Sequence, residues 1–231
     1  MLALAPPQSI VGLSKRADDF DSYLRDRVGG APLRRATTEA VLGARPDIVV
    51  RYWGGDQRLT PTLARRGVRV VQIEEASDFA GVSANVRKVA LALDRRAAGE
   101  ALIADMDRKL AASHGAWKGA GAVYLTPDGF TAGRGTLIGA MLTAAGLRNL
   151  APSDDYAGLS MERLVTHPPS ALVLGFFDGL THGGFHWSIG ANSHIQALAK
   201  GRAIVSLPGS MLGCPAWFAA DGALAIARAK R

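Results

Sequence analysis

Aromatic side chains follow two predicted strands at the point where each strand ends. Tyr52 and Trp53 come directly after the β-branched run Ile48–Val50, which predicts a strand covered on both faces, and Phe176 follows the apolar run Ala171–Leu174. The carboxyl ends of the strands of an open α/β sheet surround the crevice in which such sheets bind ligands. Aromatic rings at this edge either stack on a flat or bulky ligand or fill the core, and residue type alone leaves both interpretations open.

Three histidines, His182, His186 and His194, lie in one short stretch, and neutral imidazole is a common metal ligand. The nearest pair, His182 and His186, needs a helix to bring both rings onto one face. Gly183 and Gly184 lie between them and disfavour that helix. We therefore expect no metal site in this stretch.

A glycine-rich turn, Gly133–Gly139, leads into a predicted helix over Thr136–Ala145. Such a turn at a helix N-terminus can hold an anion. Its spacing, G-x-G-x-x-x-G, differs from a dinucleotide fingerprint, and no suitably placed acidic partner for a ribose is evident. A cytoplasmic α/β enzyme that binds a phosphate-containing ligand at this turn is the alternative function. The sequence holds no G-x-S-x-G, H-E-x-x-H, P-loop or paired-cysteine motif, so we expect a protein that is not an enzyme.

The elements that position these residues alternate between strands and helices. The apolar runs predict strands at Ile10–Leu13, Ile48–Val50, Val68–Ile73, Ala122–Leu125, Ala171–Leu174 and Ala203–Leu207, and helices at Leu59–Arg66, Ser193–Lys200 and Cys214–Ala229. A further helix is expected to begin at an N-cap on Thr37 or Thr38. A strand, a helix and a second strand in close succession imply a parallel crossover.

The longest helical pattern covers Asp78–Ala112, with a break at Leu93–Arg95 as the alternative to one continuous helix. The fold class expected is α/β, with two lobes of parallel-sheet βαβ units joined by a long backbone helix. We place the N-terminal lobe at 1–78, the connecting helix at 79–114 and the C-terminal lobe at 115–231.

The length, charge and composition of the chain exclude several classes of protein function. A chain of 231 residues suits one large domain or two small lobes. Its net charge is +7, but the lysines and arginines are scattered, so we expect no nucleic-acid partner. No apolar run approaches the roughly 18–20 residues that span a bilayer. The single cysteine, Cys214, excludes an internal disulfide and a Cys-based zinc site, and we expect it to be buried.

Several segments together resemble the periplasmic substrate-binding proteins of vitamin B12 and ferric siderophore ABC importers, whose lobes are joined by a helical backbone. Arg45–Asp56 (RPDIVVRYWGGD) is similar to the family's strand that ends in an aromatic residue beside the cleft, and its two glycines resemble B12-binding members. Residues 201–209 (GRAIVSLPG) are similar to the family's last strand. The family begins with a strand, a helix and a strand such as IVGLS, so the resemblance implies a truncated N-terminus, a missing export signal and a periplasmic location.

The resemblance also implies which loops border the cleft. Arg34 and Arg35 fall in such a loop, where guanidinium groups would bind a carboxylate, propionate or catecholate, or would simply be solvated. Phe130 and Arg134 fall in the corresponding loop of the C-terminal lobe.

Tyr156 matches an aromatic residue that reaches the ligand in the B12-binding members, and Glu162 matches a glutamate that docks on the transporter. The alternative for Glu162 is an ordinary carboxylate at a helix start. The docking glutamate of the N-terminal lobe has no match, because Arg58 occupies its place and Asp56 is offset. The resemblance therefore does not imply that this chain docks on a transporter with both glutamates, as the B12-binding members do.

We expect a monomeric substrate-binding component of an ABC importer, without a cofactor, that binds a metal chelate in the cleft between its lobes and delivers it to the permease. Tyr52, Trp53, Phe130, Tyr156 and Phe176 would stack on the chelate. The two-glycine turn and the Tyr52–Tyr156 pair favour cobalamin or another corrinoid. The excess of arginine favours an anionic ferric siderophore or haem, and the sequence leaves this choice open.

Overall fold

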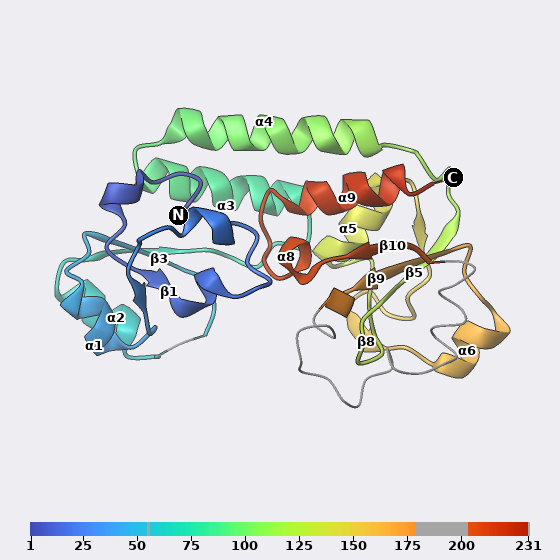
Figure 1. Cartoon of the computed structure of the whole chain (residues 1–231), viewed down its shortest axis with the longest axis horizontal. Coiled ribbons are helices and arrows are strands. Elements are labelled where there is room, and N and C mark those ends of the chain that lie inside the picture. The colour runs from blue at the N-terminus through green and yellow to red at the C-terminus, as the bar shows by residue number, and fades with distance from the viewer. Residues whose placement is uncertain (55, 179–202, 231) are drawn as a thin grey trace. The chain divides into compact units, whose positions relative to one another are not determined.

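The structure is a computed structural model that describes residues 1–54, 56–178 and 203–230 (Figure 1). Its contacts divide the chain into two compact units. Unit 1 comprises Met1–Glu75 and Ser83–Ile103, and unit 2 comprises Ala76–Val82 and Ala104–Arg231. Within the described ranges, no helix combines the length and the apolar character needed to cross a membrane.

Unit 1 contains two two-stranded parallel sheets. One pairs β1 (Leu13–Ser14) with β2 (Leu33–Arg34), and the other pairs β3 (Ile48–Arg51) with β4 (Arg69–Gln72). Helix α1 (Thr38–Gly43) precedes β3, and α2 (Leu59–Arg65) connects β3 to β4. Short 3₁₀ turns lie at Pro7–Ser9, Lys15–Asp18 and Arg25–Arg27.

Local signals set the ends of the elements in unit 1. Thr37 caps α1, because its Oγ1 accepts a hydrogen bond from the amide of Ala40 at 3.3 Å. Gly67, two residues after α2, has a φ of 73° and allows the chain to turn into β4. The first strand begins at Leu13 instead of the expected Ile10, because Ile10 closes the 3₁₀ turn before it.

The segment expected to connect the lobes forms two helices, α3 (Phe79–Ala92) and α4 (Arg96–Ser113), so the break at Leu93–Arg95 is confirmed. Asp94 has a φ of 55°, a left-handed conformation that no helix continues through. The chain then reverses and the two helices lie side by side (Figure 1). They approach closely, since a Cβ added to Gly99 would lie 2.5 Å from the Cβ of Ala90.

Unit 2 is organised around a parallel sheet with the strand order β10-β9-β5-β7. Its strands are β5 (Gly121–Leu125), β7 (Arg148–Asn149), β9 (Ala171–Gly175) and β10 (Ala203–Leu207). Helices α5 (Leu137–Ala144) and α9 (Ala219–Arg228) pack on each other, and α8 (Gly209–Leu212) precedes α9. Helix α6 (Met161–Thr166) places Leu164 in a core cluster with Val123, Leu125 and Leu172.

Two features of unit 2 differ from the sequence-based expectations. The strands β6 (Phe130–Ala132) and β8 (Tyr156–Gly158) form an antiparallel ribbon that the apolar pattern does not indicate. Cys214 is exposed, so the expectation of a buried cysteine is wrong. It lies in the link between α8 and α9, and the last helix begins at Ala219, later than predicted.

Within the part of the chain that the structure describes, β3 pairs with a strand along one edge only. In the β3–β4 ladder the amide of Arg69 donates to the carbonyl of Asp47, and the amide of Ile73 donates to the carbonyl of Arg51. Because bonding alternates along a parallel strand, Ile48 and Val50 direct their amides and carbonyls to the other edge. That edge lines a cavity of about 200 Å³ together with Gly12 and its neighbours in β1. All four residues of β3 are consequently half-buried, although the β-branched run predicts a fully buried strand.

Amide hydrogen exchange tests this description of β3. We expect slow exchange at Val49 and Arg51, whose amides point toward β4, and faster exchange at Ile48 and Val50, whose amides face the cavity. Exchange measured residue by residue by NMR on the whole chain would show the alternation. Equal protection at all four amides would mean that the outer edge of β3 has a bonding partner, and would contradict the description.

Candidate functional site

Tyr52 and Trp53 lie together at the carboxyl end of β3, as the sequence predicts. Their ring centroids are 6.1 Å apart at an interplanar angle of 70°, an edge-to-face arrangement. Tyr52 is half-buried, whereas the side chain of Trp53 is 77% exposed. An indole so open to solvent does not fill the core, so the core interpretation fails for Trp53.

The turn that carries these rings is fixed by side-chain hydrogen bonds. Arg51 donates from its guanidinium to the carbonyl of Gly54 at 2.6 Å and to the hydroxyl of Thr60. Gln72 donates from Nε2 to the carbonyl of Tyr52 at 2.6 Å. The Tyr52 hydroxyl donates to the carboxylate of Glu75, which follows β4 at the same edge of the sheet. These bonds orient the phenol ring of Tyr52.

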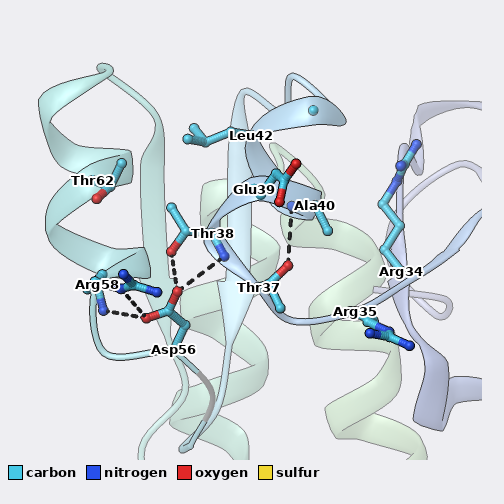
Figure 2. A pocket seen from close by; sticks show the side chains of 11 residues that line it. Arg34, Arg35, Thr37, Thr38, Glu39, Ala40, Leu42, Asp56, Arg58 and Thr62 are labelled. Atoms are coloured by element: carbon cyan, nitrogen blue, oxygen red, sulfur yellow. Dashed lines mark hydrogen bonds and ion pairs between the residues drawn. The ribbon is translucent and has the colours of Figure 1, made fainter.

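Arg34 and Arg35 line an open groove of about 1280 Å³ in unit 1, but their side chains do not converge (Figure 2). Arg34 donates from Nε to the carbonyl of Val11 at 3.0 Å, and its stem lies against Gly12. Arg35 is exposed. Both project away from the opposite wall of the groove, so they do not form one bidentate clamp.

Asp56 occupies that opposite wall and has a full set of hydrogen bonds (Figure 2). Its carboxylate accepts from the hydroxyl of Thr38 at 2.6 Å and from the amide of Arg58 at 2.9 Å. The Nε of Arg58 adds an ion pair at 3.2 Å. The hydrogen bond from Thr38, followed by those from Arg58, holds the pKa of Asp56 well below its usual range. Asp56 therefore ties the start of α2 to α1.

In unit 2, Phe130 and Tyr156 lie on the same face of the β6–β8 ribbon. Phe130 pairs with Gly158 and Ala132 pairs with Tyr156. Residues that pair or lie two apart share a face of a sheet, so the two rings are diagonal neighbours. Their side chains are 51% and 61% exposed. Together they form an exposed aromatic surface that the sequence indicates residue by residue but not as a pair.

The glycine-rich turn before α5 is occupied by the chain itself. The amide of Gly133 donates to the carbonyl of Asp155 at 3.0 Å, and the amide of Gly135 donates to the carbonyl of Asp154 at 2.8 Å. Arg134 forms an ion pair with the carboxylate of Asp154 at 2.9 Å. The glycines thus serve close approach of the backbone, and the phosphate site that the alternative function requires at this turn is not formed.

Phe176 leaves β9 with a φ of 63°, which is unusual for a bulky residue and indicates local strain. Two contacts to the end of β10 hold this turn. The amide of Phe176 donates to the carbonyl of Leu207 at 3.3 Å, and the carboxylate of Asp178 accepts from the amide of Gly209 at 3.1 Å. Phe176 is half-buried, so its ring is only partly available to a ligand.

Tyr124 lies beneath this edge on β5 and is 1% exposed. Its ring crosses Gly175, where an added Cβ would lie 2.1 Å from the hydroxyl oxygen. The hydroxyl has no hydrogen-bond partner in the described structure. Burial raises the pKa of Tyr124, and the nearby Tyr156 raises it further, so the phenol stays protonated at neutral pH.

Glu162 is exposed in the first turn of α6, after Ser160, whose Oγ accepts from the amide of Arg163 at 3.3 Å. Its place is consistent with either interpretation of that carboxylate. His182, His186 and His194 lie outside the described residues, as does the predicted helix Ser193–Lys200.

Sequence reasoning missed Glu75, Gln72, Asp154 and Tyr124. Glu75 could have been found with the rule that located the aromatic residues, because it also follows a predicted strand. Asp154 and Tyr124 carry no sequence signal, since their roles depend on contacts with distant segments.

Gly133→Ala tests the close approach at the glycine-rich turn. The new Cβ would lie 2.1 Å from the carbonyl oxygen of Ser153, so we expect a loss of about 1–3 kcal/mol in the free energy of unfolding. Gly158→Ala in β8 is the matched control, because nothing lies within 4 Å of the added Cβ. Equal stability of the two variants in chemical denaturation would contradict the described packing.

Tyr124→Phe tests the buried hydroxyl. An unpaired polar group in the interior is costly, so its removal should raise the free energy of unfolding, by about 1 kcal/mol. Denaturant unfolding of the two proteins measures the difference. A loss of stability would reveal a hydrogen-bond partner for the hydroxyl and refute its description as unpaired.

Comparisons with known proteins identify a family and a relative that are similar in sequence to this chain. Residues 5–175 match the sequence profile of the family described as "Periplasmic binding protein". A cobalamin-binding protein of Halobacterium salinarum is 30% identical over 189 residues, which cover 76% of this chain and 50% of that protein. The chain therefore spans about half the length of the curated relatives it matches.

Solved structures share the fold. A possible iron-binding, periplasmic solute-binding protein from Staphylococcus epidermidis superposes with a TM-score of 0.71 at 17% identity, covering 98% of this chain and 96% of that chain. The periplasmic heme-binding protein BhuT, in complex with two hemes, gives a TM-score of 0.69 at 25% identity, covering 88% and 85%. The two-lobed α/β architecture expected from the sequence is thus confirmed, and the chain belongs to the periplasmic binding protein family.

Proposed function

We propose that this protein is the substrate-binding component of an ABC importer and that its ligand is a metal chelate. The observation that carries the proposal is the exposure of aromatic side chains at the end of a parallel strand in unit 1 and on the β6–β8 ribbon in unit 2. Trp53 is exposed in unit 1, and Phe130 and Tyr156 are exposed in unit 2. Solvent-exposed rings at these positions supply stacking surface for a large, flat ligand.

Charge supports an anionic periphery on that ligand. Arg35 is exposed in unit 1, and the guanidinium of Arg134, although paired with Asp154, is 69% exposed. A propionate or other carboxylate could bind either group without burying an unpaired charge. Arg34 is a weaker candidate, because it already donates to the carbonyl of Val11.

Two related proteins guide the choice of ligand. The relative from Halobacterium salinarum is named a cobalamin-binding protein, and BhuT is a heme-binding protein. Both ligands are metal macrocycles, which present a broad flat face and carboxylate or amide side arms. We therefore propose a corrinoid or haem ahead of a siderophore. The permease would be the partner, with Glu162 as a contact, and the protein would work outside the cytoplasmic membrane.

A titration of the purified protein tests the function. Cyanocobalamin, haemin, ferric siderophores and NAD(P) are added in turn, and the melting temperature and the chelate absorbance are recorded. A ligand at one hundred times its dissociation constant should stabilise the fold by roughly 2.7 kcal/mol. A shift with one chelate supports the proposal. A shift with NAD(P) alone would contradict it.

Tyr156→Ala tests the aromatic surface of unit 2. Loss of one stacked ring should weaken chelate binding by about 1.5–3 kcal/mol, or roughly 10-fold to 150-fold in dissociation constant. Tyr52→Ala is expected to act in the same direction from unit 1. Leu91→Ala is the control, since Leu91 is a 55% exposed apolar residue on α3 and does not follow a strand. Chelate binding that survives both tyrosine substitutions would refute the assignment of these residues.

A further inference from the structure

Unit 2 contains a cavity whose lining does not include the aromatic residues of the proposed chelate site. It has a volume of about 370 Å³ and lies beside α6. Small-molecule sites in proteins typically have volumes of about 300–1,000 Å³, so the cavity is large enough for a small ligand. Phe130, Tyr156 and Phe176 are not among the residues that line it.

The floor of this cavity is apolar. Leu164 and Val123 belong to a buried cluster on one face of the sheet, and Leu150 and Leu159 pack against that cluster while remaining only partly buried. All four side chains line the cavity. An apolar ligand group placed here would cover leucine surface that the protein itself leaves partly open to water.

The rim carries positive charge on one face of α6. Ser160, Arg163, Leu164 and His167 all line the cavity, and their spacing of three, four and seven residues places them on one side of the helix. Arg163 is exposed and makes no ion pair with any described residue. Among the described residues that line the cavity there is no aspartate or glutamate.

The hydrogen bonding of His167 leaves it able to contribute to the rim. Its Nδ1 lies 3.0 Å from the hydroxyl of Thr166, which orients the ring. The Thr166 hydroxyl donates to the carbonyl of Glu162 at 2.8 Å and so accepts from Nδ1, and the opposite ring nitrogen donates to a carboxylate when the ring is an imidazolium. Arg163 offers a guanidinium four residues earlier on the same side of the helix. An apolar floor below two nitrogen donors is complementary to a molecule with a tail and an anionic head.

We propose that the cavity beside α6 binds a small amphipathic carboxylate, with its apolar chain against Leu150 and Leu159 and its carboxylate at Arg163 and His167. The site is separate from the aromatic residues of the proposed chelate site, so its occupancy does not depend on that function.

Octanoate is the probe, and 1-octanol is the uncharged ligand of equal chain length. Each is titrated into the whole ¹⁵N-labelled chain, and amide shifts are followed by NMR. We expect saturable shifts at 159–167 with octanoate, and binding of octanol at least tenfold weaker. Absence of saturable shifts, shifts confined to residues outside the cavity, or equal affinity for octanol would overturn the proposal.

Variants separate the two parts of the site. Arg163→Gln should weaken octanoate binding roughly tenfold or more, because a charge-assisted hydrogen bond is lost. Arg228→Gln removes the same charge from an exposed position on α9 and should leave affinity unchanged. Leu159→Glu should abolish binding, because it places a carboxylate on the apolar floor where the ligand chain would lie. If the Leu159 variant fails to fold, Arg163→Gln still tests the proposal. Unchanged affinity of the Arg163→Gln protein for octanoate would refute the assignment.

Discussion

Parallel pairing of strands is the constraint on which the rest of this structure depends. Strands that run in one direction end at one edge of their sheet, so the residues that follow them meet there whatever their separation in the sequence. In unit 2, β5, β9 and β10 pair in this way, with Leu125 opposite Leu174 and Leu207 opposite Gly175. The contact between Asp178 and Gly209 exists because β9 and β10 end together.

Close approach of the backbone is the second requirement, and glycine meets it at two places along this edge. Gly133 allows the Ser153–Asp155 segment to bond directly to the turn before α5. Gly175 allows the ring of Tyr124 to lie across the end of β9. The same residues that could be taken for a ligand-binding motif therefore act in packing. A glycine-rich turn is evidence for an anion site only when its amides remain available.

Much of the fold could be predicted from the sequence, because local patterns determine it. The β-branched run at Ile48–Val50, the apolar run at Ala171–Leu174 and the caps at Thr37 and Ser160 each carry their own signal. The β6–β8 ribbon carries none, since each of its strands is three residues long and its pairing joins distant segments. Burial was mispredicted for β3, because burial depends on which neighbours a strand has and not on its own composition.

The candidate site could also be predicted only in part, and again local features could be predicted while tertiary contacts could not. Tyr52, Trp53 and Phe176 could be located because they follow strands, which is a local property, whereas Phe130 and Tyr156 are indicated only by the resemblance to a family. Their surroundings could not, because the bond from Tyr52 to Glu75 and the ion pair from Arg134 to Asp154 join segments about twenty residues apart. The divergence of the two arginines at 34 and 35, by contrast, could have been predicted, since adjacent residues in an extended segment point to opposite sides.

The path of the chain through α3 and α4 limits how the protein can be divided into fragments that fold. The chain enters unit 2 at Ala76, returns to unit 1 at Ser83 and leaves it again after Ile103. The returning segment supplies Val89 and Ala90 to the cluster that includes Leu4 and Val71. A fragment that ends at Glu75 would lack part of its own core, and the remaining fragment would carry an apolar helical surface without its sheet. We therefore expect neither fragment to fold on its own, because each would lack part of its core.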